Sequence, residues 1–159
     1  MSNDSTPEKI NPAIGAMLLQ AREWLAHEHS LFRSLNIEPI LIGKGKATFA
    51  VDVPGKYADA DGAIHGGFIT TIIDSIFGLC VFTALEELKP IATINLRTDY
   101  IGQLEPGERV LCNAECISVN DEVAYVNGDV KTQKGNDLIA MGSGAFMVGT
   151  RGIAKGSRL

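Results

Sequence analysis

The residues best suited to chemistry lie in and just before one long apolar segment. Residues 68–85 carry a single acid, Asp74, and apolar side chains fall on every side of a helix drawn through them. Such a helix is buried in protein or in a membrane. A carboxylate placed there is costly unless it has partners or a task. We therefore expect Asp74 either to act in catalysis or to be satisfied by Thr70, Thr71 or the backbone.

The residues before this helix favour contact with a ligand. They are His65, Gly66 and Gly67, and glycine lets backbone N–H groups approach a ligand closely. The start of a helix is also the positive end of its dipole, which attracts negative charge. Close packing would explain two glycines equally well, and a histidine here is also typical of a loop or a cap. Together with Asp74, the three residues suggest a catalytic site.

Composition and charge exclude several classes of protein. The 159 residues are 45% hydrophobic and 21% charged, which is typical of one globular domain with a core. The net charge is −5 and the chain has no basic run, which argues against nucleic acid as a partner. The polar N-terminus lacks an apolar signal segment. The apolar segment is interrupted by Asp74 and lacks flanking Lys or Arg clusters, so we expect a cytoplasmic protein without membrane contact.

The three cysteines form no disulfide framework. Cys112 and Cys116 belong to one predicted strand, where their Cα atoms stand about 13 Å apart, too far for a bridge. No Cys/His spacing is typical of a zinc site. We expect buried thiols in a reducing compartment.

We expect one domain over residues 11–150, with residues 1–10 disordered and residues 151–159 a mobile tail. Apolar residues at helical spacing, preceded by a cap residue and a proline, predict an amphipathic helix over residues 12–27. Residues 35–54 are β-like and are broken by a turn or bulge at residues 43–45.

Four further strands are predicted after the central helix, and turn residues separate them. Their spacing suits an antiparallel meander over residues 91–101, 109–119, 123–131 and 138–148. A helix that is apolar all round needs a sheet curved round it, and one sheet leaves a face or its edges uncovered. This favours dimerisation through sheet edges and helix faces.

Residues 59–67 (DADGAIHGG), followed by Asp74, resemble the N-x-x-G-x-x-H-G-G-x6-D signature of hotdog-fold acyl-CoA thioesterases. The nearest group is the phenylacetate-degradation type of the 4-hydroxybenzoyl-CoA thioesterase superfamily. The likeness continues through residues 93–100 and 141–144. It implies an α+β hotdog fold, in which an antiparallel sheet wraps round a long buried central helix. It also implies an enzyme that hydrolyses acyl-CoA with water, forms a homodimer or homotetramer, and needs neither metal nor cofactor.

The resemblance assigns the central chemistry to Asp74, Gly66 and Gly67. Asp74 matches the catalytic carboxylate, which attacks the thioester or activates water, and the two glycine amides match the oxyanion donors. Asp74 lies seven residues beyond Gly67, about 10 Å along a helix, so one carbonyl cannot contact both within one chain. If both are catalytic, Asp74 meets the glycines of a second subunit, and the family builds its sites at a dimer interface in this way.

Three other residues receive supporting roles from the resemblance. His65 and Asp59 would orient water or the carbonyl, and Thr93, where Ser or Thr is usual, would position water or Asp74. Asp59 departs from the family pattern, which has Asn there. An Asn amide can donate a hydrogen bond, whereas an ionised Asp only accepts. We favour a protonated Asp59, which would donate as Asn does. The alternative is that Asp59 turns to the loop backbone.

Two alternatives to a thioesterase use the same fold. One is a module that binds acyl-CoA without cleaving it. Known sensors of that kind carry a DNA-binding helical module, which we do not expect in the short N-terminal segment. The other is a hydratase or dehydratase, whose catalytic histidine lies in a different motif. Aromatic, medium-chain and hydroxylated acyl groups all remain open as substrates.

Overall fold

The structure is a computed structural model that describes residues 9–16, 18–19 and 30–150. The helix predicted over residues 12–27 is present where it is described, and its remainder lies outside the described residues. The predictions made for residues 1–8 and 151–159 lie outside them as well. A single helical turn, α2 (Ser30–Arg33), precedes the sheet.

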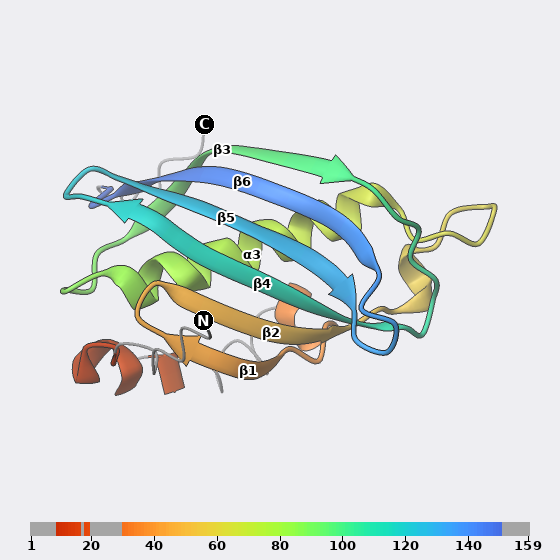
Figure 1. The fold of residues 1–159 in the computed structure, drawn as a ribbon, viewed down its shortest axis with the longest axis horizontal. Coiled ribbons are helices and arrows are strands. Elements are labelled where there is room, and N and C mark those ends of the chain that lie inside the picture. The colour runs from red at the N-terminus through yellow and green to blue at the C-terminus, as the bar shows by residue number, and fades with distance from the viewer. Residues whose placement is uncertain (1–8, 17, 20–29, 151–159) are drawn as a thin grey trace, which may run out of the picture.

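Six strands form one antiparallel sheet in the order β1-β2-β4-β5-β6-β3 (Figure 1). β1 and β2 form a hairpin that turns at Gly45, where a φ of +67° suits glycine. β4, β5 and β6 form a meander. The bounds are Glu38–Gly43 for β1, Lys46–Asp52 for β2, Ile91–Tyr100 for β3, Arg109–Val119 for β4, Val123–Thr132 for β5 and Leu138–Val148 for β6.

The position of β3 corrects the predicted four-stranded meander. β3 pairs with β6 and not with β4, so it forms the edge of the sheet opposite β1. The reason lies in the connections. Three residues join β4 to β5 and five join β5 to β6, whereas eight join β3 to β4. Hairpin loops usually have two to five residues, so the longer connection lets β3 lie away from β4.

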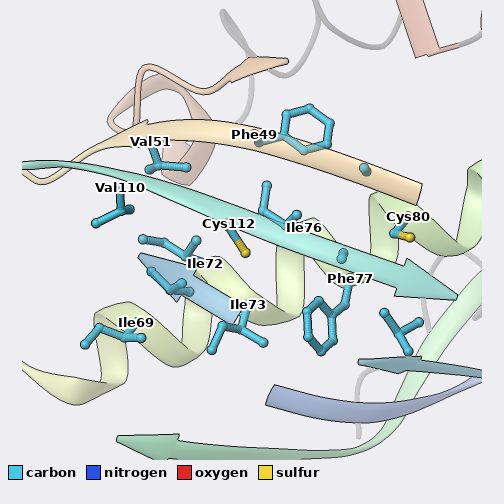
Figure 2. Packing of buried hydrophobic residues seen from close by; sticks show 14 of the residues in the cluster. Phe49, Val51, Ile69, Ile72, Ile73, Ile76, Phe77, Cys80, Val110 and Cys112 are labelled. Atoms are coloured by element: carbon cyan, nitrogen blue, oxygen red, sulfur yellow. The ribbon is translucent and has the colours of Figure 1, made fainter. Parts of the chain in front are cut away.

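The central helix α3 (Gly66–Ala84) packs along one face of the sheet (Figure 1). It is long and apolar enough to cross a membrane, but ten of its 19 residues are buried. Figure 2 shows Ile72 and Ile76 among buried residues of β2 and β4, such as Val51 and Cys112, whereas the Phe77 ring lies against β5 and β6. The sheet therefore covers most of the apolar surface of α3, and one side of the helix, which carries Thr70, Asp74 and Gly78, stays partly exposed.

Two glycines of the sheet let α3 approach closely. Gly128 on β5 and Gly142 on β6 are partners in register. A Cβ atom at Gly128 would stand 2.6 Å from the Phe77 ring, and one at Gly142 would stand 3.0 Å from it. The aromatic ring therefore occupies the space that two strand side chains would otherwise fill.

The cysteines agree with the prediction of unpaired thiols. All three are free; Cys80 and Cys112 are buried and Cys116 is partly buried. Burial raises the pKa of Cys80 to about 12 and also raises the pKa of Cys112. The two buried thiols therefore stay protonated at neutral pH.

Candidate active site

A tight loop leads from the sheet to the start of α3, after the short helix η1 (Gly55–Tyr57). The Asp59 amide donates to the carbonyl of Ala63 at 2.8 Å. The Asp59 carboxylate oxygen Oδ1 accepts from the amides of Asp61 and Ala63, at 3.0 and 3.2 Å. Asp59 is therefore turned to the loop backbone, which is the alternative to the favoured arrangement, because two loop amides supply donors for its carboxylate. The Asp61 side chain is exposed.

His65 caps the first turn of α3 and thereby occupies one predicted oxyanion donor. Its Nδ1 accepts a hydrogen bond from the Gly67 amide at 3.0 Å, and its carbonyl accepts from the Phe68 amide at 2.9 Å. Because Nδ1 is an acceptor, the neutral ring carries its proton on Nε2. The Gly66 amide has no hydrogen-bond partner among the described residues. Of the two glycine amides, that of Gly66 is thus the one open to a ligand.

Asp74 is partly exposed on α3 and is held from the neighbouring strand. Thr93 Oγ1 on β3 donates to Asp74 Oδ1 at 2.8 Å. The helix hydroxyls that could have satisfied the acid are engaged elsewhere. Thr71 donates to the Gly67 carbonyl at 2.8 Å, and Thr70 lies 2.5 Å from the Tyr100 hydroxyl. One oxygen of the carboxylate is therefore held by a hydroxyl of β3, and not by Thr70 or Thr71 of its own helix.

A β-bulge in β3 directs these strand side chains towards α3. The pairing with β6 shifts by one residue between Thr93 and Asn95. A bulge reverses the side-chain alternation beyond it, so Thr93 before it and Thr98 and Tyr100 after it all contact α3. The sequence held a signal for this. The charged side chains of Arg97 and Asp99 are expected to point to solvent, so alternation places Thr98 and Tyr100 on the helix side. Thr93 is an even number of residues from Arg97 and Asp99, so it lies on the helix side only if a bulge intervenes.

One side of α3 is left uncovered by the sheet and lies next to the edge strand β3, and the two elements run antiparallel. Gly66 lies against Tyr100, Thr70 against Thr98, and Asp74 against Thr93. Farther on, a Cβ at Gly78 would stand 3.7 Å from Ile91. The predicted residues Gly66, Asp74 and Thr93 thus belong to one strip between helix and edge strand. Tyr100, which sequence reasoning did not select, lies at the end of this strip.

A hollow of about 440 Å³ lies elsewhere, on the outer face of the sheet. Asp99, Glu115 and Asp129 are among its lining residues, and none of the predicted catalytic residues is. Each of these three acids forms an ion pair with a base, and the hollow is separate from the residues that the sequence singles out, so it is not the candidate site. Within the described part of the chain, no group of three or more His, Cys, Asp or Glu residues is arranged to hold a metal ion.

Comparisons with known proteins find thioesterases. The thioesterase superfamily matches residues 61–139, which hold α3 and β3. Human acyl-coenzyme A thioesterase 13 is 24% identical over 123 residues, which cover 71% of this chain and 85% of that protein.

Two solved structures are similar to the whole fold. A mutant of the phenylacetic acid degradation protein PaaI from Thermus thermophilus aligns with a TM-score of 0.65 and 26% identity, covering 74% of this chain and 96% of that one. The protein smu.793 from Streptococcus mutans, solved bound to acetyl CoA, aligns with a TM-score of 0.67 and 23% identity, covering 79% and 98%.

The sheet wrapped along one long helix is the hotdog fold that the sequence predicts. With the match to residues 61–139, this places the chain in the thioesterase superfamily, and the protein is a thioester hydrolase.

Proposed function

We propose that this protein is an acyl-CoA thioesterase whose sites are shared between the subunits of a homodimer. Asp74 acts as general base or nucleophile, and the Gly66 amide stabilises the oxyanion. The observation that carries the proposal is the Thr93–Asp74 hydrogen bond of 2.8 Å on the uncovered side of α3. That side also holds the open Gly66 amide, at the positive end of the helix.

The chemistry follows from the two groups. Thr93 holds Asp74 Oδ1, so Oδ2 is left to take a proton from water or to attack the acyl carbon itself. With water, the new C–O bond forms as the carbonyl oxygen gains negative charge, which the Gly66 N–H meets. Collapse of this intermediate breaks the C–S bond, and the thiolate of coenzyme A takes up the proton that Asp74 received from water. If Asp74 attacks instead, the thiolate leaves as a mixed anhydride forms, and water then hydrolyses the anhydride to release the acid and restore the carboxylate. His65, with its proton on Nε2, can donate to water or to the carbonyl.

The spacing along α3 supports a shared site. Gly66 and Asp74 are eight residues apart in one continuous helix, about 12 Å, too far to contact one carbonyl. β3 has no strand partner on its outer edge among the described residues, and such an edge is a template for pairing with another chain. A twofold pairing of β3 with its copy makes the two α3 helices antiparallel. The first turn of one helix then approaches the body of the other.

Two relatives support coenzyme A as the carrier in the substrate. Smu.793 was solved with acetyl CoA, and the human relative is an acyl-CoA thioesterase by name. A cytoplasmic location is part of the same proposal, because buried free thiols suit a reducing compartment.

The test is a panel of aromatic, medium-chain and hydroxylated acyl-CoA thioesters, with release of the coenzyme A thiol as the readout. We expect turnover of at least one class by a protein whose mass from light scattering is that of a dimer or tetramer. Titration calorimetry on the same panel tests the alternative, a module that binds acyl-CoA without cleaving it. Tight binding of acyl-CoA without thiol release would show a binding module and would contradict the proposed enzyme activity.

Subunit complementation tests the shared site. An Asp74→Ala chain and a Gly66→Pro chain should each be inactive alone. Mixed and re-associated, half of the dimers are heterodimers with one intact site of two, so about a quarter of the wild-type activity should return. Heterodimers that form, as shown by a double affinity tag, yet remain inactive would contradict sharing.

A further inference from the structure

The peptide unit that joins Gly66 to Gly67 is held at both ends. Its carbonyl oxygen accepts a hydrogen bond from the Tyr100 hydroxyl at 3.2 Å. Its amide, the Gly67 N–H, donates to His65 Nδ1 at 3.0 Å. The two contacts come from opposite directions along the chain, one from the end of β3 and one from the helix cap. They fix the orientation of the peptide plane that follows the open Gly66 amide.

Tyr100 is itself held in place. Its hydroxyl lies 2.5 Å from Thr70 Oγ1, one turn farther along α3. Its ring lies so close to Gly66 that a Cβ atom there would stand 3.1 Å from two ring atoms. A tyrosine hydroxyl has one proton. Thr70 Oγ1 also lies 3.4 Å from Thr98 Oγ1, and either hydroxyl can be the donor in the contact between Thr70 and Tyr100, so the three hydroxyls and the Gly66 carbonyl form one hydrogen-bonded chain.

We propose that Tyr100 is a positioning residue of the thioesterase reaction, which holds the Gly66–Gly67 peptide so that the Gly66 amide stays aimed at the oxyanion. The inference rests on the proposed function, in which that amide is the donor. Two glycines at a helix start are the most permissive backbone the chain could use, and the first amides of a helix have no intrahelical partner. An oxyanion donor is effective when it is preorganised, and Tyr100 supplies the restraint that the glycines lack.

The test is the Tyr100→Phe variant, which keeps the ring on Gly66 and removes the hydroxyl. We expect kcat to fall about tenfold, less than the 10²–10³-fold cost of losing a donor, with KM unchanged within about twofold. Tyr125→Phe is the matched control, because Tyr125 alternates with the buried Ala124 and Val126 and so points to the outer face of the sheet. It should leave kcat and KM unchanged.

Thr70 variants test the same contact from the other side. Thr70→Val removes the hydroxyl that meets Tyr100, whereas Thr70→Ser keeps it. We expect Thr70→Val to lower kcat by several-fold and Thr70→Ser to leave it near wild type. The effects of Tyr100→Phe and Thr70→Val should not add in the double variant, because both break one chain of hydrogen bonds. Full additivity would contradict a chain that acts as a unit.

A second readout does not depend on activity. Hydrogen exchange of the Gly67 amide, measured by NMR in the assembled protein, should be at least several-fold faster in Tyr100→Phe, with the exchange of core amides of α3 unchanged. If no thioester in the panel is cleaved, the proposed function fails, while this measurement still decides whether Tyr100 holds the Gly66–Gly67 peptide. Wild-type exchange at Gly67 together with wild-type kcat in Tyr100→Phe would overturn the inference.

Discussion

The first turn of α3 and the turn that carries Asp74 are both held by hydroxyl groups of β3, but they are held in different ways. Thr93 donates to the Asp74 side chain, whereas Tyr100 donates to a backbone carbonyl. The acid depends on one side-chain contact. The donor is the Gly66 amide, and the Gly66–Gly67 peptide that follows it is restrained by Tyr100 and by His65.

This difference predicts how the acid and the donor respond to substitution. At the acid, a change in the functional group removes the chemistry itself. At the donor, the functional group is a backbone N–H, which side-chain substitutions leave in place unless they add proline or disturb the restraint. Substitution of the acid itself or removal of the donor N–H should therefore cost most of the activity, whereas substitutions of the groups that hold them should have graded effects.

The largest effect is expected at Asp74. Asp74→Asn keeps the shape of the side chain and its acceptor for Thr93 but removes the base, so the rate should fall by about 10²–10⁴. Folding should survive, because the side chain is only partly buried. The measurement is kcat by thiol release, with Asp61→Asn in the exposed loop as the control. Full activity in a folded Asp74→Asn protein would remove Asp74 from the mechanism.

The next effect distinguishes the Gly66 amide from the space around it. Gly66→Pro removes the N–H, and the backbone tolerates it: Gly66 is the first helical residue, and His65 has the φ of −60° and ψ of 132° that suit a residue before proline. Loss of the donor should cost about 10²–10³ in kcat.

Gly66→Ala is the matched control for that change. It adds the same Cβ close to the Tyr100 ring but keeps the N–H, so its loss should be clearly smaller. Equal losses in the two variants would mean that crowding against Tyr100, and not the amide, explains the effect.

The sequence predicted the bounds of the helices and strands well, and the order of the strands in the sheet less well. The bounds of β4 and β6 agree with the prediction, because regular alternation between clear turns defines a strand. The edge position of β3 was not predicted, because strand order depends on the path of the connection and not on periodicity. The buried helix was predicted from its composition alone, since few polar residues interrupt it.

The site shows the same division between local and long-range features. His65, Gly66, Gly67 and Asp74 are close in sequence, so their motif could be found. The contact of Gly66 with Tyr100 spans 34 residues and depends on the bulge after Thr93, which shifts the alternation of β3. The hydrogen bond from the Gly67 amide to His65 Nδ1 depends on the rotamer of the His65 side chain, and no sequence pattern specifies a rotamer.

A smaller effect is expected at Thr93, and it sharpens the contrast with Tyr100. Thr93→Val keeps the shape and removes the hydrogen bond to Asp74, whose usual worth corresponds to about a tenfold change in rate. Thr93→Ser keeps a hydroxyl and should retain most of the activity. The comparison of kcat for the two variants is the measurement. A Thr93→Val enzyme as active as wild type would show that Asp74 needs no partner from β3.

The smallest effect is expected at Asp59, the departure from the family pattern. Its Oδ1 is an acceptor for the Asp61 and Ala63 amides, and the side-chain oxygen of Asn can accept both bonds equally well. Asp59→Asn should therefore keep the melting temperature and change kcat by no more than about threefold.

Asp59→Ala distinguishes a structural role of Asp59 in the loop from a role in the reaction. It removes the acceptor of both amides and should lower the melting temperature by about 3 °C, the loss of one local cap in a chain of this size. If Asp59 acts only through the loop, kcat should follow this loss of order in Asp59→Ala and stay near wild type in Asp59→Asn. An Asp59→Asn protein that is folded, dimeric and inactive at every pH would show instead that the carboxylate takes part as a second base. The donor half of the site would then depend on a side chain, as the acid half does.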